Sequence, residues 1–339
     1  RYWSVCPYNT LTAHSGGTIK GIFFIILLCA DLKPVAKDVQ KAYPLLAVFA
    51  RLWYNKGMEK LLTDVHNHTR FSPDGQDAIE EMLAAARERG VAYYGISEHF
   101  DYDYKVNNIP FYGGASASYT DPELYFSRAR ALKAAYAGQM EVLVGGEFGY
   151  MDNPAAFALY AEVIDKYSPD FVVNSVHTDG RADYSTEEAY LDKNGGLRPK
   201  EEVYREYFSL VKKSLEAPYS FDIVGHLGFC TRYAPYGDKR ARYEEYRSEI
   251  DGILLRIIEK DKILEVNGAG RGGASEFLPD RDILKRYYRL GGRKVSYASD
   301  AHSTPSILRN REKIAAALKE IGFTCVTVPV HGERIETAL

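Results

Sequence analysis

Short runs of apolar, β-prone residues recur along the chain from Met58 onward, and stretches of helical composition fill most of the gaps. Seven runs are predicted to be strands: Leu61–Val65, Val91–Ile96, Glu141–Val144, Asp170–Val176, Phe221–Val224, Ile263–Val266 and Lys294–Ala298. Seven stretches are predicted to be helices: Ala78–Arg89, Pro122–Ala137, Ala155–Lys166, Lys200–Leu215, Tyr243–Lys260, Asp280–Leu290 and Thr304–Ile321. This alternation predicts βαβ units and a parallel sheet.

Polar, metal-binding side chains follow these runs at their C-terminal ends. They are His66 and His68, His99, Glu147, His177, His226, Asn267, and Asp300 with His302. In α/β barrels the active site is built from the C-terminal ends of several strands. The placement therefore favours a closed or nearly closed β/α barrel over its competitor, an open doubly wound sheet.

The composition is that of an ordinary globular protein, with 46% hydrophobic and 26% charged residues. A formal charge of −3 and the lack of a Lys/Arg cluster argue against a nucleic-acid partner. The four cysteines (Cys6, Cys29, Cys230, Cys325) are scattered without paired spacing. This pattern argues against a disulfide framework and a Cys-rich zinc site, and it favours a reducing, cytoplasmic location.

Residues 1–57 form an N-terminal extension of doubtful origin, because the first Met is Met58 and a predicted strand follows it directly. The longest apolar run there, Gly21–Ala30, is shorter than the roughly 20 residues that a bilayer-spanning helix needs. We therefore expect no membrane segment. The catalytic domain is predicted to occupy residues 58–339; a genuine helical appendage before it is the alternative.

Two pairs of candidate ligands, one of two histidines and one of an aspartate and a histidine, have the spacing of residues that share one face of a strand. In His66-Asn67-His68 and in Asp300-Ala301-His302, positions i and i+2 can approach the same ion. Either pair alone is weak evidence for a metal site. The prediction of a metal site rests on the recurrence of such residues, together with other ligand types, at the ends of the seven predicted strands.

The candidate metal ligands number nine, which is too many for one zinc ion. They are His66, His68, Asp74, His99, Glu147, His177, His226, Asp300 and His302. This set fits two or three divalent ions, and imidazole with carboxylate suits Zn, Mn or Fe. Clustered metals can activate water and hold the oxygens of a phosphoryl group. The sequence therefore predicts a metal-dependent hydrolase of small phosphate esters.

The order of these motifs resembles the PHP (polymerase and histidinol phosphatase) family over residues 58–339. The resemblance rests on these motifs: HxH at 66–68, Asp74, Glu98-His99, Glu147, Ser175-Val176-His177, Gly225-His226-Leu227, Glu265-Val266-Asn267 and Ser299-Asp300-Ala301-His302. The histidinol-phosphate phosphatase branch is the most similar. The resemblance implies a distorted (β/α)7 barrel that hydrolyses L-histidinol phosphate during histidine biosynthesis.

The resemblance also implies an assignment of the ligands to three metals. His66, His68, Glu147 and Asp300 would hold the first metal, and Asp74, His99 and His302 the second. Glu147 would bridge to a third metal, which is held also by His177 and His226. Asp300 or a neighbouring histidine such as His302 would protonate the leaving group.

Phosphate recognition requires cations outside the metal shell, because Arg presents a planar fork to phosphate oxygens. Arg232 and Arg271 follow predicted strands and resemble arginines of the histidinol phosphatases; Arg181 is a third candidate. Asp101 and Asp103 are candidate partners for the substrate's amine. Two rivals stay open: a PHP phosphoesterase of nucleotides or oligonucleotides, and a PHP accessory module. The sequence does not indicate an oligomeric state.

Overall fold

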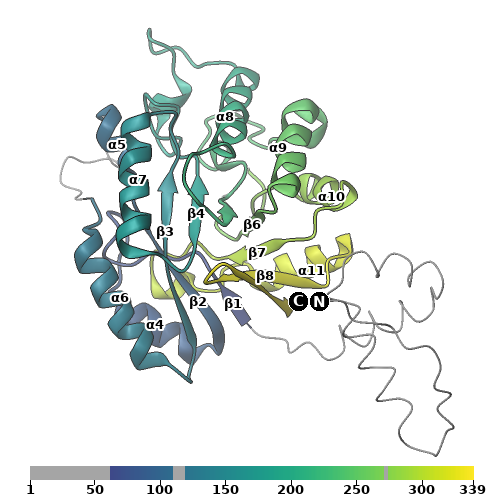
Figure 1. The fold of residues 1–339 in the computed structure, drawn as a ribbon. Helices are drawn as coiled ribbons and strands as arrows, with labels where there is room; N and C mark the ends of the chain where they lie inside the picture. The colour runs from purple at the N-terminus through teal and green to yellow at the C-terminus, as the bar shows by residue number, and fades with distance from the viewer. Residues whose placement is uncertain (1–61, 110–118, 271–273) are drawn as a thin grey trace, which may run out of the picture. The chain divides into compact units, whose positions relative to one another are not determined.

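A computed structural model describes residues 62–109, 119–270 and 274–339 of the chain (Figure 1). Residues Glu59–Leu339 cluster as one compact unit. The predicted extension over residues 1–57 and Arg271 lie outside the described residues.

Seven parallel strands form one sheet in the order in which they occur along the chain. They are β1 (Leu62–Asp64), β2 (Val91–His99), β3 (Glu141–Gly149), β4 (Val172–Ser175), β5 (Ile223–Val224), β6 (Ile263–Asn267) and β7 (Val295–Ala298). Each coincides with one of the seven predicted runs. Their residues are buried on both faces, as expected of a parallel sheet covered by helices.

Hydrogen bonds between the ends of β1 and β7 bring the first and last strands together. The amide of Asp300 donates to the carbonyl of His66 (3.0 Å), and that of His68 donates to the carbonyl of Ala301 (2.8 Å). The pairing between strands is uneven, with seven residue pairs between β2 and β3 but two between β4 and β5. The result is the distorted, nearly closed (β/α)7 barrel that the sequence predicts.

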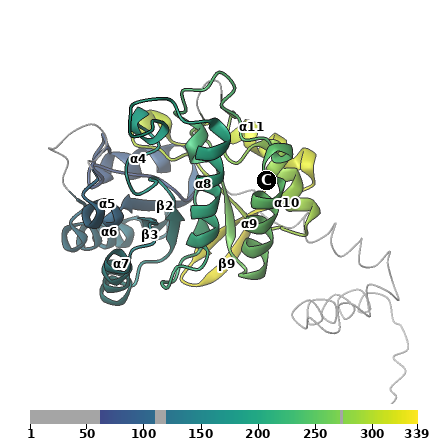
Figure 2. The ribbon, with the colours of Figure 1, turned by 90° about the horizontal axis from the view of Figure 1, so that it is seen from above.

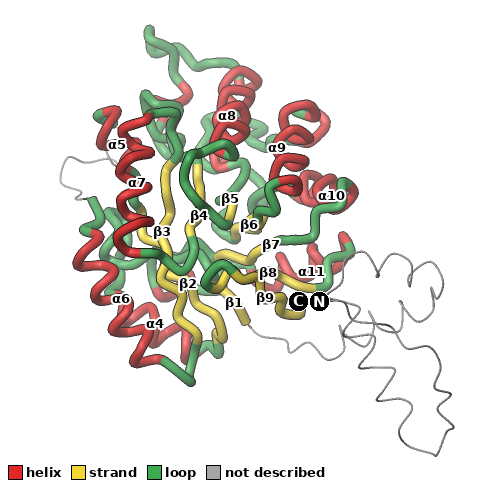
Figure 3. Tube along the Cα trace, in the orientation of Figure 1, coloured by secondary structure: helices red, strands yellow, loops and turns green. Residues whose placement is uncertain are grey.

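Eight helices lie within the described residues, and most cover the outside of the strands (Figures 2 and 3). They are α4 (Ile79–Glu88), α5 (Tyr102–Asn107), α6 (Pro122–Tyr136), α7 (Pro154–Tyr167), α8 (Lys200–Ser214), α9 (Arg247–Glu259), α10 (Arg281–Arg289) and α11 (Arg311–Ile321). Seven of them match predicted helices.

Local signals explain where several helices begin and end. The side chains of Asp121 and Asn153 accept backbone hydrogen bonds at the starts of α6 and α7, where a proline occupies the first turn. At the end of α4, Gly90 has a φ of +73°, a left-handed conformation that glycine adopts without steric cost.

Three elements depart from the sequence-based prediction. Residues 102–107, predicted as a loop, form α5. The helix predicted over Thr304–Ile321 is a short 3₁₀ turn (Thr304–Ser306) followed by α11, because Leu308 and Asn310 between them have positive φ angles. Finally, β8 (Cys325–Val330) and β9 (Glu333–Ala338) form an antiparallel hairpin that the prediction lacks.

The hairpin packs against the strands of the barrel. Val328 of β8 shares a buried apolar cluster with Val65, Leu143, Phe171, Val173, Ile223 and Ile263. These residues belong to or flank five different strands, so the cluster is an apolar core inside the barrel. Such a core holds the strand ends in fixed relative positions, and that is what a multi-ligand site requires.

Among the described residues, no helix combines the length and the apolar character that crossing a membrane requires.

Candidate metal centre

The structure brings all nine predicted ligands into one cluster at the C-terminal ends of the strands. His66 and His68 follow β1, His99 ends β2, and Glu147 lies in β3. The others stand in loops after β1, β4, β5 and β7: Asp74, His177, His226, Asp300 and His302. Seven of the nine side chains are at least nine-tenths buried, and Asp74 (31% exposed) and His302 (25% exposed) face outward most.

The first group of ligand atoms surrounds a point near the end of β1. Nε2 of His66 lies 3.1 Å from Nε2 of His68 and 3.2 Å from Oε2 of Glu147. Nε2 of His68 is 3.5 Å from both Oε2 of Glu147 and Oδ1 of Asp300. These four side chains therefore direct one atom each toward a shared space.

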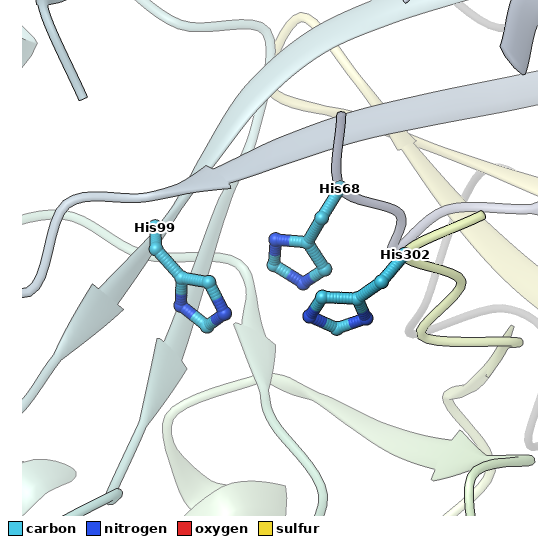
Figure 4. A group of neighbouring side chains, drawn as sticks. All are labelled: His68, His99 and His302. Atoms are coloured by element: carbon cyan, nitrogen blue, oxygen red, sulfur yellow. The ribbon is translucent and has the colours of Figure 1, made fainter. Parts of the chain in front are cut away.

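A second group contains three histidines from three segments of the chain. Figure 4 shows the rings of His68, His99 and His302 side by side. The ring of His68 stacks between the other two, with centroid distances of 4.2 Å to His99 and 4.3 Å to His302. Asp74 completes the group, with Oδ2 at 3.0 Å from Nε2 of His302 and Oδ1 at 3.7 Å from Nε2 of His99.

The third group lies on the other oxygen of Glu147. Oε1 of Glu147 is 3.1 Å from Nε2 of His177 and 2.8 Å from Nε2 of His226, and the two ring nitrogens are 3.3 Å apart. One carboxylate thus contacts two groups of ligands, Oε2 on the first and Oε1 on the third. This is the geometry of a bridging ligand.

These separations match those between ligands of a common ion. Zinc bonds to imidazole and carboxylate of about 2.0–2.2 Å place tetrahedral ligand atoms about 3.3 Å apart. The first and third groups span 2.8–3.5 Å. Facing ring nitrogens at 3.1 Å also need a cation or a shared proton between them. The donor set therefore fits divalent metal ions.

Burial and charge give His68 and Glu147 the ionisation states that metal ligands need, whereas neighbouring carboxylates raise the pKa of His66, His99 and His177 above the usual range. Burial, with His99 and His302 nearby, lowers the pKa of His68 to about 3, so its ring is neutral. Burial alone would raise the pKa of Glu147, but His66, His177 and His99 hold it well below the usual range. Glu147 is therefore a carboxylate.

Carboxylates outside the nine ligands hold the ligand rings. Oε2 of Glu265, at the middle of β6, lies 2.6 Å from Nδ1 of His66. Oε1 of the same side chain accepts hydrogen bonds from the amide of His226 (3.0 Å) and from Nδ2 of Asn267 (2.8 Å). Glu265 entered the sequence analysis only as part of a family motif, although its position at a predicted strand end is a usable signal.

The prediction that Asp101 and Asp103 face the substrate is wrong. Both side chains are fully buried, and neither lines the cavity described below. Asp101 contacts His177 and His99, whereas Asp103 contacts the hydroxyl of Tyr160. Burial, with Asp101 next to it, raises the pKa of Asp103 to about 8. The alternating acids and tyrosines of residues 101–104 are therefore buried at the start of α5 and do not line the substrate cavity.

Of the three candidate arginines, Arg232 lies in the site. It is 7% exposed, and its guanidinium donates to Oδ2 of Asp300 and to Oδ1 of Asn267, each at 3.0 Å. Its Nε is buried without a hydrogen-bond partner among the described residues. Arg181 is half exposed and pairs with Asp179 outside the cavity. Arg271 lies outside the described residues.

A cavity of about 410 Å³ opens onto the cluster. Seven of the nine ligand side chains and Arg232 form part of its wall. The remaining described wall residues carry hydroxyl groups or aromatic rings: Ser185, Thr186, Phe229 and Tyr233. Its volume lies at the small end of the range for small-molecule sites, about 300–1,000 Å³.

Known proteins are similar to this chain over most of its length. The family model described as "PHP domain" matches residues 64–269. The chain is 30% identical over 275 residues to a protein from Clostridium acetobutylicum named "Probable histidinol-phosphatase", covering 81% of this chain and 98% of that one. It is 28% identical to the histidinol-phosphatase of Lactococcus lactis, covering 78% and 93% of the two chains.

The fold also matches a solved structure. The crystal structure of histidinol phosphate phosphatase from Lactococcus lactis, in complex with zinc, L-histidinol and phosphate, superposes with a TM-score of 0.66. The two chains are 25% identical in that comparison, which covers 81% of this chain and 98% of the other. Together with the barrel and the ligand cluster, these matches establish that the chain belongs to the PHP domain family.

Proposed function

We infer that this protein is a metal-dependent phosphatase that hydrolyses L-histidinol phosphate to L-histidinol and phosphate. The observation that carries this inference is the cluster of nine ligand side chains around a bridging Glu147. It occurs in a chain that covers 98% of a relative named "Probable histidinol-phosphatase". A reaction of this kind is a step of histidine biosynthesis.

We propose that the three groups of side chains hold two or three divalent ions, with zinc, manganese or iron as candidates. His66, His68, Glu147 and Asp300 would form one position, and Asp74, His99 and His302 a second. His177 and His226 would form the third with Glu147. When bound, the ions supply an acidified water and positive charge for the phosphoryl oxygens.

Arg232 is the protein's own cation for the phosphate. Its planar guanidinium is fixed by Asp300 on one side and by Asn267 on the other, both at 3.0 Å. Because these two contacts use two of its five N–H groups, the others remain to meet a phosphoryl oxygen from the cavity wall. A fixed donor of this kind stabilises charge on the phosphoryl oxygens without reorganising during the reaction.

The leaving alkoxide needs a proton, and the two predicted donors differ. Burial would raise the pKa of Asp300, but His68, Arg232 and His66 hold it well below the usual range. Asp300 is therefore an ionised ligand and a poor acid. His302 lies at the cavity wall and is partly exposed, but it is also a ligand of the second metal position, so neither of the two predicted donors is a free acid.

Substrate size and chemistry fit the cavity. The hydroxyls of Ser185 and Thr186 offer hydrogen bonds, and Phe229 and Tyr233 offer ring faces for an imidazole or an ammonium group. The same rings could stack on a nucleobase, which keeps a nucleotide phosphatase as the second candidate. We propose a cytoplasmic enzyme without a nucleic-acid partner, in keeping with the scattered cysteines and a net charge of −3.

A panel of phosphate monoesters tests the substrate. The zinc-loaded protein is assayed with L-histidinol phosphate, nucleoside monophosphates and an aryl phosphate. We expect kcat/KM for histidinol phosphate to exceed the others by at least tenfold. Equal or faster turnover of the nucleoside monophosphates would overturn the substrate and leave the metal chemistry in place.

A further inference from the structure

One buried carboxylate contacts histidines that belong to two different metal positions. Asp101 lies two residues after the end of β2, and its side chain has no exposed surface. Oδ1 lies 3.1 Å from Nδ1 of His177, and Oδ2 lies 3.2 Å from Nδ1 of His99. The two histidines stand 78 positions apart in the sequence, at the ends of β2 and β4.

The far side of the His177 ring carries its other nitrogen toward the ligand cluster, where Nε2 meets Oε1 of Glu147 and Nε2 of His226. Nε2 of His99 faces Oδ1 of Asp74 at 3.7 Å, and its Nδ1 lies between Oδ2 of Asp101 (3.2 Å) and Oε2 of Glu147 (3.1 Å). A metal-binding imidazole must present a bare nitrogen to the ion, and a carboxylate on the opposite nitrogen fixes that tautomer.

The surroundings of Asp101 are shaped to admit the carboxylate. A side chain at Gly149, the last residue of β3, would place its Cβ 2.6 Å from Oδ1 of Asp101. Asp101 precedes α5 at the N-cap position, where aspartate often caps, yet its side chain makes no capping hydrogen bond there. The carboxylate is turned to the two rings instead.

We propose that Asp101 is a positioning residue that sets the tautomer and orientation of His99 and His177 together, and thereby couples the second and third metal positions. It touches neither the cavity nor the substrate. The proposal rests on the metal centre of the proposed function but not on the identity of the phosphate ester. Its test therefore measures metal binding and not turnover.

The chain offers a matched control in Asp103. This carboxyl is also fully buried, lies two residues further along, and approaches Gly149 as closely as Asp101 does. Its carboxyl accepts a hydrogen bond from the hydroxyl of Tyr160, and no hydrogen bond or ion pair joins it to a histidine among the described residues. Asp103→Asn therefore also replaces a buried carboxyl group by an amide, but at a position that does not contact the rings of His99 and His177.

The experiment is a zinc titration of wild type, Asp101→Asn and Asp103→Asn against a chromophoric chelator. An amide at 101 offers an N–H to one ring, which forces that ring to accept at Nδ1 and to carry its proton on Nε2. We expect Asp101→Asn to bind at least one zinc equivalent at least tenfold more weakly, within the 10–100-fold range for such residues. Asp103→Asn should bind zinc as wild type does. Equal zinc affinity in all three proteins would overturn the proposal.

A measurement on the unmodified enzyme decides the matter if Asp101→Asn fails to fold. Long-range ¹H–¹⁵N spectra of the zinc-loaded wild type report which ring nitrogen carries the proton. Protonated Nδ1 and zinc-bound Nε2 on both His99 and His177 are expected. Zinc on Nδ1 of either ring would contradict the proposal. If the protein binds zinc with the expected tautomers but does not hydrolyse histidinol phosphate, the proposed substrate is wrong and the role of Asp101 is supported.

Discussion

The ring of His66 and the carboxylate of Glu265 lie in direct contact, with Nδ1 of His66 2.6 Å from Oε2 of Glu265 although 199 positions separate them. Both side chains are fully buried. Because β7 lies between β6 and β1, this contact spans the intervening strand. It leaves Nε2 of His66 directed at His68 and Glu147, the atoms of the first metal position.

Replacing this carboxylate should weaken metal binding. In Glu265→Gln, the amide fixes His66 less strongly, so we expect half-maximal activity to need at least tenfold more free zinc. Phosphatase activity is measured across a series of buffered zinc concentrations. Glu312→Gln, at an exposed position in the first turn of α11, is the control. A zinc dependence identical to that of the control would show that Glu265 does not support the metal centre.

Arg232 should act on the phosphate and not on the fold alone. Arg232→Ala removes a charge-assisted donor from the cavity wall, so kcat/KM for histidinol phosphate should fall on the order of a hundredfold. Arg181→Ala, which removes a half-exposed arginine outside the cavity, should stay within about twofold of wild type. If both variants lose the same activity, the assignment of Arg232 fails.

Tyr207 should stabilise the loop that carries His226 and Arg232. Its hydroxyl accepts hydrogen bonds from the amides of Gly228 (3.0 Å) and Phe229 (3.1 Å). Tyr207→Phe leaves the buried amide of Gly228 unsatisfied, whereas that of Phe229 still donates to the carbonyl of His226 (3.0 Å). The free energy of unfolding should therefore fall by about 1–3 kcal/mol, measured by urea denaturation.

A second buried tyrosine provides the matched comparison. The hydroxyl of Tyr246 has no hydrogen-bond partner among the described residues. Tyr246→Phe should therefore be neutral or slightly stabilising. A loss of stability in Tyr246→Phe as large as that in Tyr207→Phe would mean that the hydrogen bonds of Tyr207 are not the cause.

A protein that begins at Met58 should fold and keep its activity. Every candidate ligand and Arg232 lie between His66 and His302, within the compact unit Glu59–Leu339. The shortened and full-length proteins are compared by circular dichroism and by kcat/KM. Insoluble or inactive shortened protein would show that residues 1–57 contribute to the domain.

The strands and the ligands could be predicted from the sequence because each is a local pattern. A buried parallel strand appears as a short apolar run, and the ligand that follows it is of a distinctive residue type. The end of β2 is less visible: Ser97 and Glu98 are polar, yet they extend the strand by pairing with Gly145 and Gly146 of β3. This extension depends on a partner and not on the run itself.

The residues that support the ligands could not be assigned from local pattern. The sequence around Asp101 alternates acids and tyrosines, as an exposed loop also does, and its partner His177 is 76 positions away. The same holds for the hairpin, since the packing of Val328 inside the barrel depends on residues from distant strands. Roles of this kind are set by the tertiary structure, so the sequence alone leaves them open.

The central claim is that hydrolysis of histidinol phosphate depends on the clustered metal site. The most direct test measures the metal content and the release of phosphate from L-histidinol phosphate in the same sample, before chelation, after it and after reloading with zinc. We predict more than one equivalent of divalent metal per chain, loss of activity on exhaustive chelation, and its return with zinc. Undiminished hydrolysis by metal-free protein would contradict the account.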